Sequence, residues 1–187
     1  EGEMDFPYVG VDGTHGMKLV GEHLIGLGHR RIACIAAPSD LMFADHRLSG
    51  LRDVLRSHGL ELADEDVVVG DLTQKSGFEV AVRLLDRPQP PTAIVACNDL
   101  MALGVMSAIQ ERGLEVGKDI AVTGFDNIPM AEHSHPPLTT VHQPIYQIGK
   151  MVCGMLIQIL RGEDLLSRHV MLEPELIVRH SCGRAPG

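Results

Sequence analysis

Polar side chains follow several of the apolar runs that read as strands, and they include every group needed to bind a small polar ligand. Because the carboxyl ends of parallel strands meet at one edge of an open α/β sheet, we expect these side chains to crowd one rim. The rim residues are Asp12, Ser39, Asp40, Asp45, Arg47, Asp71, Asn98, Asp99, Asp126, Asn127 and Gln143.

This set of groups favours a polyhydroxylated ligand such as a sugar. Carboxylates accept hydrogen bonds, amides both accept and donate, and a guanidinium presents a rigid fork of donors. A phosphate ligand favours a glycine-rich loop and more cations. The sequence therefore predicts a sugar-type binding site.

Each of the main candidates also has a simpler interpretation. Asn98 is well suited to cap the following helix, and Asp126-Asn127 suits an Asx-turn. Arg47 lies in a predicted helix, where arginine is mostly exposed. The convergence of all three on one predicted rim favours binding, although the simpler interpretations stay open.

Motifs for catalysis or for a metal are weak. The sequence contains no G-x-S-x-G, no G-x-x-x-x-G-K-[ST] and no G-x-G-x-x-G after a strand. His133 and His135 have no third ligand at a sensible spacing, so solvated loop histidines are the better reading. His29 follows Gly28 at a predicted helix end, where a cation complements the helix dipole. We expect no enzyme, no metal and no cofactor.

Composition narrows the class of protein. Among 187 residues, 25 acidic against 16 basic residues give a formal charge of −9, which opposes non-specific binding to a phosphate backbone. No apolar run reaches the roughly 18 residues of a membrane span, and the first residues do not form a signal peptide. The four cysteines are far apart and read as buried reduced thiols, which predicts a cytoplasmic protein.

Apolar runs alternate with segments of helical period, which predicts an α/β fold with a doubly wound parallel sheet and crossover helices. The predicted strands lie at 8–11, 32–37, 66–70, 92–97, 119–124, 138–142, 169–172 and 175–179. The predicted helices lie at 14–27, 44–58, 75–87, 99–112 and 144–161.

Both ends of the chain raise separate expectations. The helix at 144–161 is apolar nearly all round and needs cover on more than one side, so we expect it to belong to a second lobe. The chain opens almost directly into a strand, which suggests that upstream sequence is missing. The tail at 183–187 is expected to be disordered.

Seven blocks of sequence, taken in order, resemble the LacI/GalR family of bacterial transcription regulators. The resemblance covers nearly the whole chain and concerns the family's inducer-binding core, which has the fold of type I periplasmic binding proteins. The blocks are GHRRIA at 28–33, RLSG at 47–50, PTAI at 91–94, NDLMALG at 98–104, DIAVTGFDN at 119–127, PLTTVHQP at 137–144 and LEPEL at 172–176.

The resemblance implies two lobes with a ligand in the cleft between them. Residues 12–142 and 175–187 would form the C-terminal lobe, and residues 1–11 and 143–174 part of the N-terminal lobe. The family's DNA-binding headpiece has no counterpart here, so operator DNA would be contacted only through a missing segment. A transport-type sugar-binding protein has the same fold and is the alternative function.

The resemblance also implies roles for single residues. Arg47, Asn98 and Asp126 match ligand-gripping positions, and Gln143 lies at a crossover facing the cleft. Leu72 and Phe125 occupy wall positions, and Leu72 replaces an aromatic residue of purine-binding relatives, which favours a sugar over a flat base.

The resemblance further implies a homodimer formed through the C-terminal lobe. The candidate interface residues are Leu103 and Met106 on the helix at 99–112, together with Ile128. The alternative for that helix is plain packing on its own sheet.

Overall fold

The main body of the molecule is a six-stranded sheet. The computed structural model describes residues 6–185, and the strand order in this sheet is β3-β2-β4-β5-β6-β8. The strands are β2 (Ile32–Ala36), β3 (Val67–Val69), β4 (Ala93–Ala96), β5 (Ala121–Asp126), β6 (Thr139–His142) and β8 (Glu175–Ile177).

All neighbouring strands of this sheet are parallel except β6 and β8, which are antiparallel. The chain leaves the sheet at the carboxyl end of β6 and returns at the same edge, where Glu175 pairs with His142. A strand that re-enters at that edge must run in the opposite direction. The predicted doubly wound α/β fold is thus confirmed, with one antiparallel edge strand.

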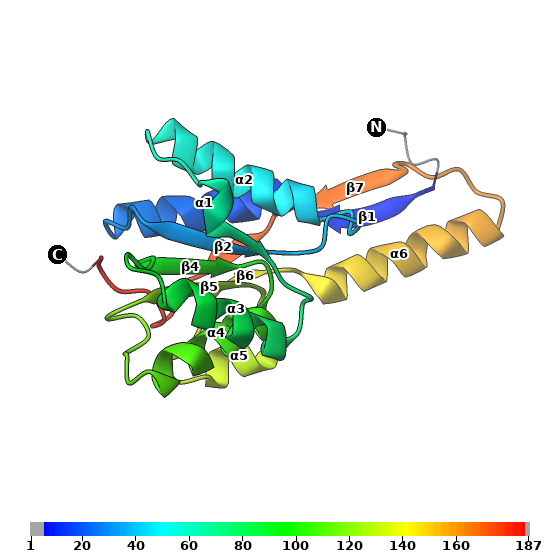
Figure 1. The fold of residues 1–187 in the computed structure, drawn as a ribbon. Coiled ribbons are helices and arrows are strands. Elements are labelled where there is room, and N and C mark those ends of the chain that lie inside the picture. Colours follow the sequence, from blue (N-terminus) through cyan, green and yellow to red (C-terminus); the bar gives the residue numbers. More distant parts are fainter. Residues whose placement is uncertain (1–5, 186–187) are drawn as a thin grey trace.

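Helices cover both faces of the sheet (Figure 1). Helices α1 (Gly13–Gly26) and α2 (Ala44–Ser57) lie on one face, and α3 (Gln74–Leu85), α4 (Asp99–Glu111) and the short α5 (Pro129–His133) lie on the other. Burial on two faces explains why the central strands are apolar throughout rather than alternating.

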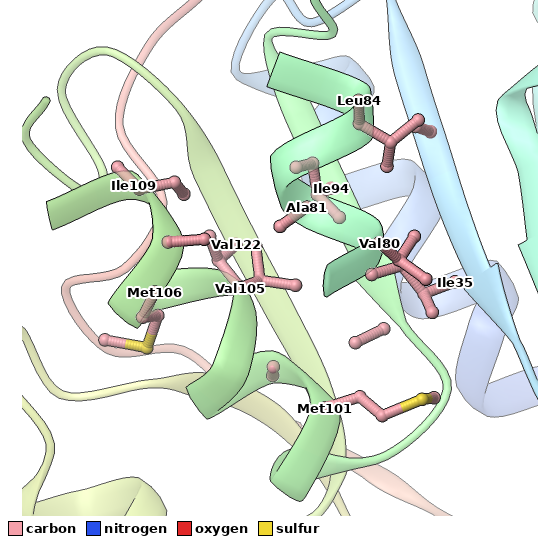
Figure 2. Close-up of a cluster of buried hydrophobic side chains, with 14 of the residues drawn as sticks. Ile35, Val80, Ala81, Leu84, Ile94, Met101, Val105, Met106, Ile109 and Val122 are labelled. Atoms are coloured by element: carbon pink, nitrogen blue, oxygen red, sulfur yellow. The ribbon is translucent and has the colours of Figure 1, made fainter. Parts of the chain in front are cut away.

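Two apolar cores result, one on each side of the sheet. The core under α3 and α4 contains Ile94 and Val122 from the strands (Figure 2). The core under α1 and α2 contains Val95 and Phe125 from the same strands. Because successive side chains of a strand point to opposite faces, one short strand supplies both cores.

Helices α3 and α4 approach each other closely at two glycines. A Cβ on Gly104 would lie 2.0 Å from the carbonyl oxygen of Gln74, and one on Gly77 would lie 2.2 Å from that of Met101. No side chain fits at either contact, so the pair forms one rigid unit at the carboxyl edge of the sheet.

A second, two-stranded sheet stands apart from the first. Strand β1 (Tyr8–Val11) pairs in parallel with β7 (His169–Leu172), and α6 (Ile145–Leu160) contacts β1. No residue of α6 is buried, and its exposed apolar side chains include Leu156 and Leu160. Figure 1 shows this layer extending away from the larger sheet.

Most predicted elements are confirmed, with differences at their ends. Strand β5 begins and ends two residues later than predicted, so Phe125 and Asp126 belong to the strand. The 3₁₀ turn at Asp64–Asp66 and helix α5 were not predicted, because each is too short to show a period. None of the helices within residues 6–185 is long and apolar enough to cross a membrane.

The C-terminal segment corrects two predictions. The Ala185 amide donates to the Leu27 carbonyl, and the ring of His29 hydrogen-bonds the Gly183 carbonyl at 2.9 Å. Residues 183–185 are therefore ordered, while 186–187 lie outside the described residues. His29 is 1% exposed and also contacts the Thr92 hydroxyl at 3.0 Å, so it joins the tail to the sheet rather than capping a helix.

Candidate functional site

A cavity of about 570 Å³ lies between the carboxyl edge of the large sheet and the β1–β7 layer. All six predicted ligand-binding residues line it. Its walls also contain residues that sequence reasoning did not single out. The cavity is lined by Tyr8, Val9, Gly10, Val11, Asp12, Gly13, Met42, Phe43, His46, Arg47, Leu72, Asn98, Phe125, Asp126, Gln143 and Met171.

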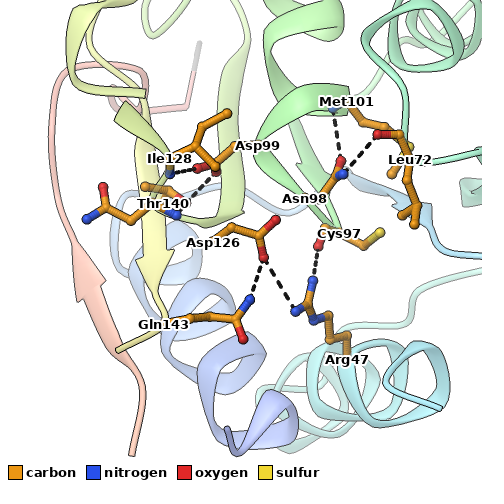
Figure 3. A network of polar contacts seen from close by, with 11 residues as sticks. Arg47, Leu72, Cys97, Asn98, Asp99, Met101, Asp126, Ile128, Thr140 and Gln143 are labelled. Atoms are coloured by element: carbon orange, nitrogen blue, oxygen red, sulfur yellow. Dashed lines mark hydrogen bonds and ion pairs between the residues drawn. The ribbon is translucent and has the colours of Figure 1, made fainter. Parts of the chain in front are cut away.

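The guanidinium of Arg47 lies at the centre of this cavity wall (Figure 3). Arg47 is only 6% exposed, so its interpretation as a surface residue is wrong. It donates to the Cys97 carbonyl, and a second nitrogen lies 3.6 Å from Asp126 Oδ1. Burial lowers the pKa of Arg47, and the Asp126 carboxylate opposes that shift. Arginine stays charged in such surroundings.

Two aromatic rings hold this guanidinium in place. Its Cζ lies 3.6 Å from the centroid of Phe125 and 4.4 Å from that of Phe43. Arg47 Nε is buried and has no hydrogen-bond partner among the described residues. The rings therefore supply the cation–π contacts that orient the planar group.

Asp126 accepts from two sides at the end of β5. Gln143 Nε2 donates to Asp126 Oδ1 at 2.6 Å, on the segment that follows β6 (Figure 3). Burial raises the pKa of Asp126, while Arg47 and the bond from Gln143 lower it. Arg47, Asp126 and Gln143 thus join α2, β5 and the crossover to α6 in one polar network.

Asn98 caps α4, as its simpler interpretation predicted. Its Oδ1 accepts from the Met101 amide at 2.9 Å, and its Nδ2 donates to the Leu72 carbonyl at 2.9 Å. Leu72 has a φ of 70°, which is unusual for a residue with a side chain. Asn98 therefore lines the cavity and also holds the wall residue Leu72 in a left-handed conformation.

Asp99 is a buried acid whose importance sequence reasoning missed. It is 0% exposed, accepts from the Thr140 hydroxyl at 2.5 Å and accepts from the Ile128 amide at 2.8 Å. Burial raises its pKa to about 6, although both hydrogen bonds act in the opposite direction. Its place directly after the cap residue Asn98 was the available signal.

Of the other predicted rim residues only Asp12 reaches the cavity, where it caps α1 by accepting from the His15 amide. The remainder lie outside the cavity lining because strand ends alone do not decide where side chains point. These residues are Ser39, Asp40, Asp45, Asp71, Asp99 and Asn127.

The dimer candidates are not equally accessible. Met106 is 3% exposed and belongs to the core under α4, so packing on its own sheet is the correct interpretation for this residue. Leu103 and Ile128 are half-buried against the same core. The apolar side chains exposed nearby are Leu100 and Met130, which the sequence did not single out.

The cysteines and potential metal ligands have separate fates. Cys34 and Cys97 are buried, and burial raises the pKa of each thiol to about 12. Cys153 is exposed on α6, so the expectation of burial is wrong there. Within residues 6–185, no three His, Cys, Asp or Glu side chains gather closely enough to hold a metal ion.

Known proteins resemble this chain over nearly its whole length. The family model for the periplasmic binding protein-like domain matches residues 21–182. The repressor CytR of Escherichia coli is 36% identical over 184 residues, covering 98% of this chain and 54% of CytR. The ribose operon repressor of Escherichia coli is 39% identical over 167 residues, covering 89% and 51%. The chain thus spans about half the length of these relatives.

Solved structures show the same fold. A LacI-family regulatory protein from Chloroflexus aggregans has a TM-score of 0.91 at 39% identity, covering 98% of this chain and 66% of that protein. The regulator CelR, solved as a cellobiose complex, has a TM-score of 0.91 at 37% identity, covering 96% and 55%. The chain therefore belongs to the family of periplasmic binding protein-like domains, in the form that LacI-family transcriptional regulators carry.

Proposed function

We propose that this chain is the effector-binding region of a LacI-type transcriptional regulator, and that the effector is a sugar or a sugar derivative. The observation that carries the proposal is the convergence of Arg47, Asp126 and Gln143 in a cavity between two sheets. Charged and amide groups of this kind pair well with vicinal hydroxyls.

The apolar part of the cavity supports the same ligand class. Leu72, Phe43 and Met42 line one part of the wall, away from the carboxylate of Asp126. Sugars present C–H groups as well as hydroxyls, so an apolar wall beside a polar network suits them. The crystallised complex of the relative CelR with cellobiose agrees with this choice.

The two sheets suggest how binding is transmitted. We assign residues 12–142 and 175–187 to one lobe, and residues 1–11 and 143–174 to part of the other. A ligand that contacts both sides favours one relative geometry of the lobes, and it shifts that equilibrium only by its differential affinity for the two states. Asp126 and Gln143 lie on opposite sides of this boundary.

The partners follow from the same proposal. We expect a cytoplasmic homodimer that contacts operator DNA through a DNA-binding headpiece outside this chain, and we expect no catalysis. Leu103 and Ile128 stay candidates for the dimer contact, with the exposed Leu100 and Met130 beside them.

A thermal-shift screen of the complete regulator tests the effector class. The panel contains cellobiose, D-ribose, other pentoses and hexoses, their phosphates and several nucleosides. A ligand that binds only the native state stabilises it by RT ln(1 + [L]/Kd), so a true effector raises Tm in step with log concentration. A panel in which no sugar raises Tm would overturn the proposal.

Variants on one helix test the site itself. Arg47→Ala should abolish the effector response in an operator-binding assay and leave operator binding intact. Arg52→Ala is the matched control, because Arg52 lies on the same helix and pairs with the exposed Asp64 outside the cavity. An effector response that survives in Arg47→Ala contradicts the assignment.

A further inference from the structure

The carboxylate of Asp99 lies behind the cavity wall rather than in it. Asp99 is completely buried at the first turn of α4, and it is not among the residues that line the cavity. Its Oδ2 accepts from the Ile128 amide at 2.8 Å. The acid therefore contacts the backbone two residues beyond Asp126 without reaching the ligand space.

The backbone that Asp99 contacts has an unusual conformation. Asp126 has a φ of 115° and Asn127 a φ of 56°, and both values are unfavourable for residues with side chains. Such a conformation persists only where surrounding contacts determine it. The Ile128 amide is the first backbone donor after this pair.

The surroundings of Asp99 leave room for its carboxylate alone. A Cβ on Gly124 would lie 2.2 Å from Asp99 Oδ1, so any larger residue at that position displaces the acid. The Thr140 hydroxyl donates to the same oxygen at 2.5 Å, and Thr140 Oγ1 also accepts from the Asn127 amide at 3.4 Å. Asp99 and Thr140 thus hold two consecutive amides of the turn (Figure 3).

A second set of contacts holds the side chain of Asn127. Arg179 donates to Asn127 Oδ1 at 2.8 Å, and Asn127 Nδ2 lies 3.2 Å from His142 Nδ1. These contacts fix the side chain but not the amide of Ile128. Asp99 is therefore the group that determines where the backbone leaves the turn.

We infer that Asp99 is a positioning residue for the ligand site: through the Ile128 amide and Thr140 it sets the turn 126–128 so that the Asp126 carboxylate meets Arg47 and Gln143. This inference rests on the proposed function for its ligand, but the position of the turn can be measured without one. It assigns the acid of the Asn98-Asp99 pair a role distinct from helix capping.

Three substitutions separate positioning from general stability. Asp99→Ala leaves the Ile128 amide and the Thr140 hydroxyl without an acceptor. Asp99→Asn restores both contacts, because its amide oxygen can accept from Ile128 and its nitrogen can donate to Thr140. Thr140→Val removes only the hydroxyl at nearly unchanged shape.

Thr123→Val is the matched control for Thr140→Val. Both threonines are 0% exposed and lie on adjacent strands of one sheet. The hydroxyl of Thr123 has no hydrogen-bond partner among the described residues. The two variants thus make the same chemical change, and only one of them touches Asp99.

The first measurement is hydrogen exchange at the Ile128 amide in the complete protein without ligand. We expect Asp99→Ala to accelerate exchange at least tenfold and Thr140→Val severalfold. Asp99→Asn and Thr123→Val should stay within about threefold of the unmodified protein. Thermal unfolding of each variant shows that the fold is retained, and unchanged exchange at Ile128 in Asp99→Ala overturns the inference.

The second measurement is the affinity for cellobiose by calorimetry. We expect at least a tenfold loss in Asp99→Ala, recovery in Asp99→Asn and no change in Thr123→Val. Faster exchange at Ile128 with unchanged cellobiose affinity also overturns the inference. If cellobiose does not bind the unmodified protein, that failure belongs to the proposed ligand, and the exchange comparison alone decides the role of Asp99.

Discussion

The guanidinium of Arg47 lies over the ring of Phe125, with 3.6 Å between Cζ and the ring centroid. The ring is held from its other side by α1, where a Cβ on Gly16 would lie only 2.8 Å from Phe125 Cε2. An aromatic residue of β5 thus transmits the position of α1 to the central cation of the site. This contact makes Phe125 more than an inert wall residue.

Replacement of that ring should separate stability from orientation. Phe125→Leu keeps an apolar side chain in a fully buried position, so we expect a loss of about 2 kcal/mol in unfolding free energy from the cavity it leaves. The cation–π contact disappears as well. Urea denaturation measures the first effect, and sugar affinity measures the second. Wild-type affinity in this variant contradicts the role of the ring.

Arg47→Lys tests whether the site needs the planar fork or only the charge. A lysine ammonium keeps the charge but cannot contact the Cys97 carbonyl and Asp126 together while stacking on a ring. We expect a loss of sugar affinity of roughly tenfold or more, since a charge-assisted bond contributes about 1.5–3 kcal/mol. Calorimetry on Arg47→Lys and Arg52→Lys makes the comparison, with no change expected in the second.

Leu72→Gly should affect binding more than folding. Glycine adopts a φ of 70° without steric cost, which offsets the extra chain entropy that it loses on folding. We therefore expect the unfolding free energy to change by less than about 1 kcal/mol. The apolar wall is lost, so sugar affinity should fall. Destabilisation well beyond this range would mean that the Leu72 side chain mainly stabilises the core.

Asp99→Asn should alter how stability depends on pH. The ordinary pKa of an aspartate is 3.8, and that of Asp99 in the folded chain is about 6. Between these values the folded state holds a proton that the unfolded state releases, so stability falls as pH rises through this window. The shift corresponds to a free energy on the order of 2–3 kcal/mol.

The comparison of the two proteins at several pH values isolates this effect. Asparagine does not ionise, so Asp99→Asn should gain stability relative to the wild-type protein between pH 4 and pH 7. Denaturant unfolding at each pH supplies the free energies. A difference that stays constant over the whole range would show that Asp99 does not titrate there.

Local pattern was sufficient for the elements and for part of the site. Strands that are buried on both faces are continuous apolar runs, and helices keep their period, so the order of elements could be read directly. The capping role of Asn98 was also readable, because a cap depends on its own helix terminus. The resemblance to a known family then located Arg47, Asp126 and Gln143.

Tertiary structure decided the properties that depend on distant contacts. Arg47 is buried because α2 places it between Phe43 and Phe125, and Met106 faces its own core instead of a partner. His29 became a link to the C-terminal tail because residue 183 folds back onto it. None of these contacts has a local signature, since each joins segments far apart in the chain.

The sequence by itself determined which groups stand at the strand ends, and so the kind of chemistry that the site performs. Only the tertiary structure decided that Asp126 faces the cavity while Asp99 lies beneath it, although both acids end neighbouring strands. The physical reason is the backbone: two residues with positive φ turn Asp126 and Asn127 outward, and the space at Gly124 admits the carboxylate of Asp99.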